Sequence, residues 1–351
     1  MLDKKTQKSG DKSLNIQAKD VDVHIGLTYD NARQIALDVF NANFLQLSEK
    51  AANIAFLRAQ ELIDFYLRRV SEKGPHLLRS AEDPDMQYAL FTAQKEYARS
   101  GDKDLSELLV DILIDRAAET NRSVLQIVLN EALSVAPKLT VQQFNVLSLI
   151  YIIKYTRQLD LNGLDDFAQY IRKLILPFTD NFRSDNACFQ HLEYAGCGNL
   201  QADDRIVYPA FARLSKAIYP GLFWRGATEN EIEELLMIDQ RIKTIVIPCL
   251  HNADLYQFDV IDGEELREEC QVRGLDDATI RTLLSFQVGH LFDDGQVHKI
   301  IKELVPEFTE FMHTWGQSLR RFSLTSVGIA IAHANIRRKT GREFNLNIWI
   351  N

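Results

Sequence analysis

The fold is decided by residues 140–153, which read TVQQFNVLSLIYII. Thr140 and Gln143 have the spacing of a capping box, so a helix is expected to begin at this point. The residues that follow, from Phe144 to Ile153, are apolar on nearly every face of that helix. A helix that is apolar all round usually lies at the centre of a core. The sequence therefore predicts a mainly α-helical protein, a multi-helix bundle packed around this segment.

Caps divide the rest of the chain into further helices. Asp83, directly before a proline, is expected to cap one helix, and Thr228 with Glu231 forms a second capping box. Near the end of the chain, Thr325 is a suitable N-cap for an apolar helix, and Gly341 is a suitable residue to follow its last turn.

The first helical segment is unusually long. From Thr28 onward, apolar residues recur at three- and four-residue steps, and no glycine or proline intervenes until Gly74. This pattern favours one helix of about 40 residues, or ~60 Å. The alternative is a pair of helices with a break near Asn41 to Ser48.

The two ends of the chain have a different pattern, because apolar and polar residues alternate over 14–25 and again over 344–350. Such alternation predicts β-strands, which need a partner strand for their backbone groups. We expect the two segments to form a small β element, either by pairing within one chain or by pairing between copies. The predicted self-association residues are Leu14, Ile16, Gln17, Val21, Val23, Ile25, Phe344, Leu346, Ile348 and Ile350.

Four segments are expected along the chain. They are an N-terminal β segment (1–27), a helical domain (28–177), an irregular connection rich in glycine and proline (178–228) and a C-terminal helical domain that ends in the strand (229–351). Within the last segment, Thr244 to Ile247 is expected to form a further strand that ends at Pro248, and the alternative is that these residues form the end of a helix.

Composition excludes some classes of protein. The net charge of −9 disfavours sequence-independent nucleic-acid binding, which depends on Lys and Arg neutralising phosphates. No apolar run is long enough for a membrane span, and residues 1–13 lack the apolar region of a secretory signal. Four cysteines among 351 residues are expected to be reduced thiols in a cytoplasmic protein.

Catalytic motifs for nucleotide, metalloprotease and serine-hydrolase chemistry are absent, and we predict no cofactor. The one metal-like spacing joins Cys188, His191 and Cys197, three zinc-type ligands within ten residues. The alternative interpretation is that the two cysteines are buried apolar residues and that the histidine is hydrogen-bonded on a helix.

One concentration of basic residues stands out near the end of the chain. It comprises Arg320, Arg321, Arg337, Arg338, Lys339 and Arg342. If both runs lay on one face, they could contact phosphates. The simpler interpretation is a set of solvated helix ends.

The chain resembles an uncharacterised family of bacterial hypothetical proteins over essentially its whole length. The resemblance is carried by four stretches: residues 10–29, 83–91 (DPDMQYALF), 188–198 (CFQHLEYAGCG) and 324–336 (LTSVGIAIAHANI), the last followed by the ending IWIN. The lead-in Gly-Asp-x-Ser-x-Asn-x-Gln-Ala is also similar to N-terminal segments of bacterial conflict and phage-defence proteins. The Asp-Pro and Leu-Thr helices look like those of abortive-infection α-type proteins. The resemblance implies no catalytic residues.

Three functions are therefore open. The first is a non-enzymatic bacterial defence protein that binds a partner, either a protein or a phage-derived trigger, and self-associates into a homo-oligomer through its terminal β segments. The second is a winged-helix-like nucleic-acid-binding regulator that uses the basic residues. The third is a hydrolase with an unrecognised site around Cys188, His191 and Cys197.

Overall fold

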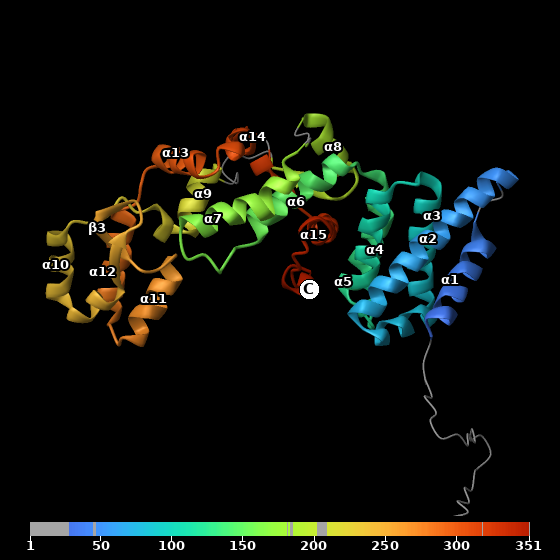
Figure 1. Ribbon diagram of the computed structural model, residues 1–351, viewed down its shortest axis with the longest axis horizontal. Helices are drawn as coiled ribbons and strands as arrows, with labels where there is room; N and C mark the ends of the chain where they lie inside the picture. Colours follow the sequence, from blue (N-terminus) through green and yellow to red (C-terminus); the bar gives the residue numbers. More distant parts are fainter. Residues whose placement is uncertain are drawn as a thin grey trace, which may run out of the picture.

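A computed structural model describes residues 28–44, 47–180, 182, 185–201, 209–317 and 319–350. Within them the protein is mainly helical, with two small antiparallel sheets. Figure 1 shows an elongated molecule in which the first helices form one end and the segment around residues 230–290 forms the other. The predicted N-terminal β segment, including Leu14, Ile16, Gln17, Val21, Val23 and Ile25, lies outside the described residues.

The longer helices are α1 (Tyr29–Asn43), α2 (Glu49–Lys73), α3 (Pro84–Ser100), α4 (Lys103–Ala118), α5 (Val124–Val135), α6 (Val141–Tyr155), α7 (Leu164–Tyr170), α8 (Asn186–Tyr194), α9 (Phe211–Ile218), α10 (Glu229–Ile238), α11 (Gly263–Val272), α12 (Asp277–Gly289), α13 (Asp294–Leu304), α14 (Thr309–Gln317) and α15 (Ser326–Thr340). Short helical turns used below are η1 (Pro75–Glu82), the π-helical η3 (Ile171–Ile175), η7 (Gln240–Ile245), η9 (Leu319–Arg321) and η10 (Leu346–Ile348). The strands are β1 (Gly198–Leu200), β2 (Val246–Cys249), β3 (Asn252–Phe258) and β4 (Phe322–Leu324).

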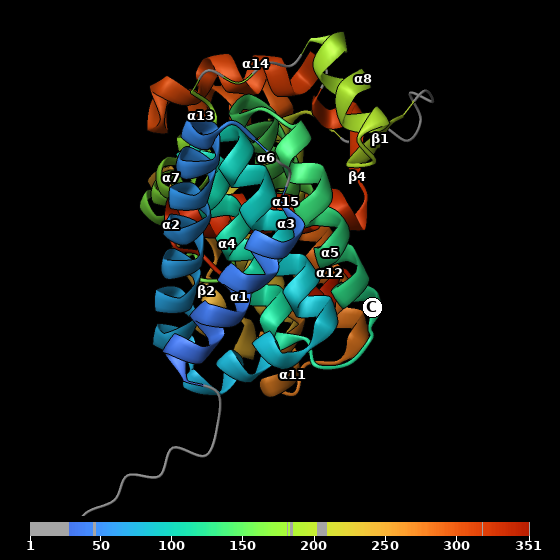
Figure 2. The ribbon, with the colours of Figure 1, turned by 90° about the vertical axis from the view of Figure 1, so that its right-hand side faces the viewer.

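Helices α1 to α5 form a bundle at one end of the molecule, seen face on in Figure 2. The single long helix favoured by the sequence is not what forms here. It is two helices, with α1 ending at Asn43 and α2 beginning at Glu49, and the break falls where the alternative placed it. The chain turns back because the apolar face of α1 is then buried: Phe40 and Phe44 stack at 4.5 Å, and Phe40 packs in a cluster with Ala59 of α2.

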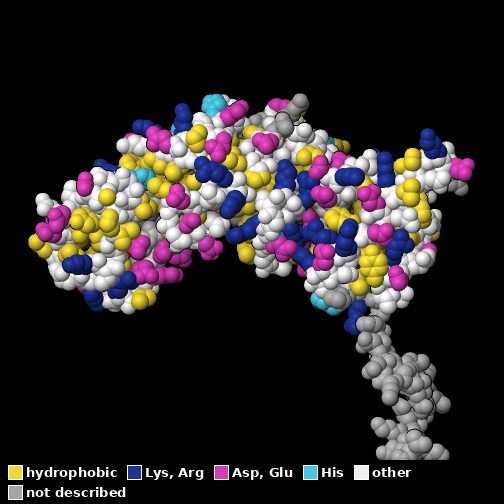
Figure 3. Space-filling view, viewed as in Figure 1, with side chains coloured by type: hydrophobic (Ala, Val, Ile, Leu, Met, Phe, Trp, Pro, Cys, Tyr) yellow, Lys and Arg dark blue, Asp and Glu magenta, His cyan; other side chains and the backbone are white. Residues whose placement is uncertain are grey.

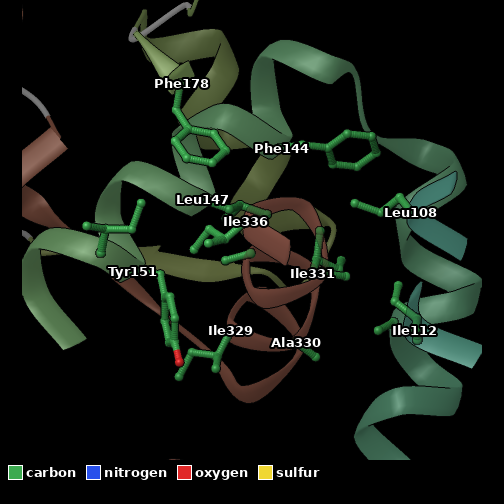
Figure 4. Close-up of a cluster of buried hydrophobic side chains, with 14 of the residues drawn as sticks. Leu108, Ile112, Phe144, Leu147, Tyr151, Phe178, Ile329, Ala330, Ile331 and Ile336 are labelled. Carbon is green, nitrogen blue, oxygen red and sulfur yellow. The ribbon is translucent and has the colours of Figure 1, made fainter. Parts of the chain in front are cut away.

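Helix α15 runs through the middle of the main core and packs on α4, α5 and α6 (Figure 4). Eleven of its residues, Val327 to Arg337, are buried. The backbone of α15 approaches the backbone of Cys197 closely at Gly328, where a Cβ would lie 2.0 Å from the Cys197 carbonyl oxygen. Helix α6 is buried from Gln143 to Ile153, as its apolar sequence predicts. Two helices that are buried over most of their length therefore form the centre of the fold.

A second, smaller core lies at the far end of the molecule from the α1–α5 bundle. It is built from residues between Trp224 and Leu283, where the hairpin β2–β3 packs with α10, α11 and α12. The predicted strand at Thr244 to Ile247 is displaced, because η7 occupies the chain to Ile245 and β2 continues through Pro248 to Cys249. The division at residues 177/178 and 228/229 stays a prediction.

The C-terminal strand predicted over Phe344 to Ile350 is wrong. Asn345 accepts a hydrogen bond from the backbone N–H of Asn347, and the chain closes into the 3₁₀ turn η10. The backbone groups of this segment therefore bond to one another instead of to a partner strand. Its apolar side chains are used for docking, because Leu346 and Ile350 are buried in the main core, whereas Ile348 is 64% exposed.

Candidate functional site

The basic run of α15 is mostly engaged inside the protein. Arg337 is 5% exposed and donates from Nε to Oδ1 of Asp111 at 3.0 Å and from Nη1 to Oδ1 of Asp115 at 2.6 Å. Both carboxylates lie on α4, and Asp111 also accepts from Arg69 of α2 at 2.9 Å. Arg337 thus ties three helices together and presents no free guanidinium to a phosphate.

Burial and charge act against each other on these two carboxylates. Burial raises the pKa of Asp111 by more than the charges of Arg337 and Arg69 lower it, so its net shift is upward. Burial also raises the pKa of Asp115, but contact with His333 and the charge of Arg337 outweigh it, and the net shift is downward. The network therefore holds one carboxyl with a raised pKa beside one with a lowered pKa.

His333 links this network to the end of the chain. Its Nε2 accepts a hydrogen bond from the backbone N–H of Phe344 at 3.1 Å, so the proton of the neutral ring lies on Nδ1. That Nδ1 lies 3.4 Å from Oδ2 of Asp115. Farther along, Trp349 donates from Nε1 to the carbonyl of Tyr155 at 3.0 Å and packs edge-on against Tyr151. The C-terminal segment is thereby fixed to α15 and α6.

The remaining basic residues do not come together on one face. Arg338 pairs with Asp104 and Glu107, and Lys339 donates to the carbonyl of Pro177 at 3.2 Å. Arg320 and Arg321 lie in η9, beyond the opposite end of α15, so about 16 Å of helix separates them from Arg337. On the face shown in Figure 3, basic and acidic side chains are interspersed, which reduces the positive potential that a nucleic-acid backbone would meet.

Arg342 is placed differently from the rest of its run. Together with Lys173 of η3 it lines a cavity of about 300 Å³ at the C-terminal end of α15. The sequence grouped Arg342 with its neighbours in the run, but it could not show that a lysine 169 positions earlier lies at the same cavity.

The zinc candidates do not form a metal site. Cys188 and His191 lie on α8, where the His191 Nδ1 is within 2.9 Å of the Gln143 side-chain amide. Cys197 is fully buried in the main core, and burial raises the pKa of its thiol to about 12 and that of Cys188 to about 11. Among the residues that the structure describes, no three His, Cys, Asp or Glu side chains are placed to hold a metal ion.

A groove of about 430 Å³, which the sequence did not single out, lies between α3, α5 and the segment that links α8 to β1. Its apolar lining includes Tyr88 of α3 and Ile127 and Val135 of α5, and the first two are 66% and 40% exposed. Val124, one turn before Ile127 on the same face of α5, is 52% exposed. The signal was present in the sequence, since residues 124–129 (VLQIVL) place apolar side chains on more than the one buried face.

One side of the groove begins near the point where the described chain starts. Helix α1 contacts both η1 and α3, and Asp85 and Tyr88 lie in the first turns of α3, directly after η1. Thr28, the first described residue, therefore lies at the same end of the bundle as Asp85 and Tyr88.

No helix in the described part of the chain is both long and apolar enough to cross a membrane. Comparison with known proteins gives one result. A family model described only as ":-like" matches residues 26–350. No curated protein matches the chain, and no solved structure does.

Proposed function

We propose that the chain, which belongs over residues 26–350 to the family whose model matches it, acts as a non-enzymatic binding protein that self-associates. In the proposed assembly, residues 14–25 of one copy dock in the groove beside α5 of a second copy. The single observation that carries the proposal is the exposed apolar surface at that groove, where Tyr88 and Ile127 line the groove and Val124 lies one turn before Ile127. Exposed apolar patches in grooves are characteristic of interaction sites.

The dimensions of the groove suit this occupant. Helix α5 has 12 residues and is about 18 Å long. An extended stretch from Val21 to Ile25 spans about 16 Å and places Val21, Val23 and Ile25 on one face. Three apolar side chains at this spacing can cover the exposed apolar face of α5.

The length of the connection favours a second copy over the same chain. Helix α3 contacts both α1 and α5, so α5, which forms the far side of the groove, lies roughly two helix spacings, or about 16–20 Å, from α1. Ile25 is only three residues from Thr28, a reach of about 10 Å. Ile25 of the same chain therefore falls short of α5, although Val21, seven residues from Thr28, has a reach of about 24 Å. Val21, Val23 and Ile25 can thus lie together along α5 only when they come from another copy.

Self-association through the C-terminal segment is no longer part of the proposal. Phe344, Leu346 and Ile350 are used within the chain, and η10 presents no strand edge. A role in bacterial conflict or phage defence rests on the sequence resemblance alone and stays a prediction, as does the identity of any further partner.

The two other functions draw less support. A nucleic-acid regulator would need Arg337 and Arg338, whose guanidinium groups are engaged by Asp111, Asp115 and Asp104. A cysteine hydrolase would need a thiolate, and burial raises the thiol pKa values of both candidate cysteines.

The experiment compares the molar mass in solution of the full-length protein with that of a protein beginning at Thr28, by light scattering. We expect an oligomer for the first and a monomer for the second. Ile127→Glu in the full-length protein should also give a monomer, because it places a charge in the apolar groove. Val272→Glu on α11 is the matched control, since Val272 is 83% exposed and outside the groove.

Two outcomes would overturn the proposal. The first is an identical molar mass for the full-length and shortened proteins. The second is a monomeric full-length protein in which Ile127→Glu changes the hydrogen-exchange protection of residues 14–25, because the segment would then dock on its own chain.

A further inference from the structure

The cavity at the C-terminal end of α15 is separate from the groove beside α5. It lies between α7, η3, the loop that follows α6 and the residues that follow α15, and its volume of about 300 Å³ is at the lower end of the range for small-molecule sites. Aliphatic, aromatic, amide, acidic and basic side chains all contribute to its walls. This mixture is suited to a small polar ligand with one aromatic or sugar-like ring.

Two cations from different elements face this cavity. Lys173 comes from η3 and Arg342 from the segment after α15, and both are exposed. Within the described residues, neither side chain forms an ion pair. By contrast Arg337 and Arg338 of the same run are each paired with two carboxylates. Lys173 and Arg342 therefore keep their charge available for a ligand.

Arg342 is directed to the cavity by the way α15 ends. Gly341 adopts φ +70°, a left-handed conformation that glycine reaches without strain, and the chain leaves the helix axis there. The backbone N–H of Arg342 is then held by Oγ1 of Thr340 at 3.2 Å. Burial raises the pKa of Tyr170 while the positive charge of Arg342 acts to lower it, which is consistent with the guanidinium lying near that phenol.

Lys173 is presented by an uncommon backbone. The backbone that follows α7 is π-helical from Ile171 to Ile175. Lys173 and Leu174 therefore lie at different angles around the helix axis from those that a continuous α-helix would give them. π-helical turns are rare, and they occur frequently at functional sites. The π turn is thus a second, independent observation at the same cavity.

The opposite charge is also present. Asp160 and Asp166 line the cavity, and Asp166 Oδ2 already accepts from the backbone N–H of Asn162 at 3.0 Å and from its side-chain amide at 3.3 Å. No hydrogen bond or ion pair engages the Asp160 carboxylate within the described residues, so it can accept from a ligand hydroxyl or amino group.

We propose that this cavity binds a small phosphorylated molecule of about the size of a nucleoside monophosphate. Lys173 and Arg342 contact the phosphate, since a guanidinium and an ammonium together match a dianion. The ring lies against Tyr170, and a hydroxyl or amino group of the ligand donates to Asp160.

The test is isothermal titration calorimetry of the full-length protein with adenosine monophosphate, adenosine and inorganic phosphate. Adenosine monophosphate should bind more tightly than either fragment. Arg342→Ala and Lys173→Ala should each weaken its binding about tenfold or more, because each removes a charge-assisted hydrogen bond. Lys339→Ala is the matched control: Lys339 belongs to the same basic run, does not line the cavity and should leave the affinity unchanged.

Asp160→Asn tests the contact with the hydroxyl or amino group of the ligand separately from the contacts with its phosphate. It should weaken the binding of adenosine monophosphate and should not weaken that of inorganic phosphate, because it removes a negative charge from the cavity. The proposal is overturned if none of the three probes binds at low-millimolar concentration, or if adenosine monophosphate binds with the same affinity to the Arg342→Ala and Lys173→Ala proteins. Thermal unfolding of each variant checks its fold, and both substituted cations are at the surface.

Discussion

Replacing Arg337 by alanine should destabilise the protein severely. Arg337 is 5% exposed and its guanidinium bonds to two carboxylates, so its removal leaves Asp111 and Asp115 with fewer positive charges beside them. Breaking a buried pair in this way costs about 3–5 kcal/mol. That is a large part of the about 5–15 kcal/mol by which most domains are stable.

The assay is urea unfolding followed by circular dichroism, with the free energy of unfolding obtained by linear extrapolation. Lys299→Ala supplies the comparison, because the Lys299–Glu303 pair on α13 is 77% and 66% exposed, and its loss should cost at most about 1 kcal/mol. If Arg337→Ala also costs less than about 1 kcal/mol, the buried network does not hold α15 in place and the reasoning is refuted.

The same network predicts how stability changes with pH. The pKa of Asp115 is lower in the folded protein than the value of about 3.9 in the unfolded chain. The ionised carboxylate therefore stabilises the fold above that pH, and this stabilisation is lost as the pH falls through the folded pKa. Asp115→Asn should therefore be less stable than the wild type at neutral pH, and the difference should shrink below about pH 4. A difference that stays constant from neutral pH to pH 3 would contradict this assignment.

Two further variants test the packing at the ends of the fold. Trp349→Ala should lower the free energy of unfolding in urea by about 2–3 kcal/mol, since a half-buried indole and its hydrogen bond to Tyr155 are lost. Ile348→Ala, at a 64% exposed position, should lower it by under about 0.5 kcal/mol. Equal losses would mean that η10 does not dock as described. Gly328→Ala should lower stability by about 1–3 kcal/mol, because its Cβ would lie 2.0 Å from a carbonyl oxygen. Gly316→Ala, with no heavy atom within 4 Å of the added Cβ, should be neutral or stabilising in thermal unfolding. A neutral Gly328→Ala would show that α15 can shift at no cost.

The helix boundaries were the most predictable part of this fold. The capping boxes at Thr140 and Thr228 both form, and Thr325 and Gly341 delimit α15 as expected. These signals are local, because a cap satisfies backbone groups within three residues of itself. The buried position of α6 was equally predictable, since no face of residues 144–153 is polar enough to meet water.

The C-terminal end of the chain was less predictable for a physical reason. Alternation at Phe344 to Ile350 is compatible with a strand, but a strand requires a partner edge, and the nearest apolar surface is the aromatic face of Tyr151 on α6. A 3₁₀ turn satisfies its own backbone and still docks Trp349 there. The alternation of apolar and polar residues in a short segment does not indicate which surface of the folded protein the segment will contact.

The partners of the basic run could not be predicted from the sequence for a related reason. A run of Arg and Lys at a helix end usually indicates solvation, and the carboxylates that engage Arg337 lie more than 200 positions earlier in the chain. In the same way, only the folded chain places Lys173 beside Arg342. Pairings over such sequence distances leave no periodic signal.

The central position of α15 has a consequence for synthesis. This helix is encoded at residues 326–340, about 170 residues after α6, so a ribosome completes α4, α5 and α6 long before it releases the segment that fills the space between them. Until then α4, α5 and α6 expose the apolar surfaces that later cover α15. The nascent protein should therefore depend on chaperones, or on very rapid closure once α15 has emerged, to avoid aggregation.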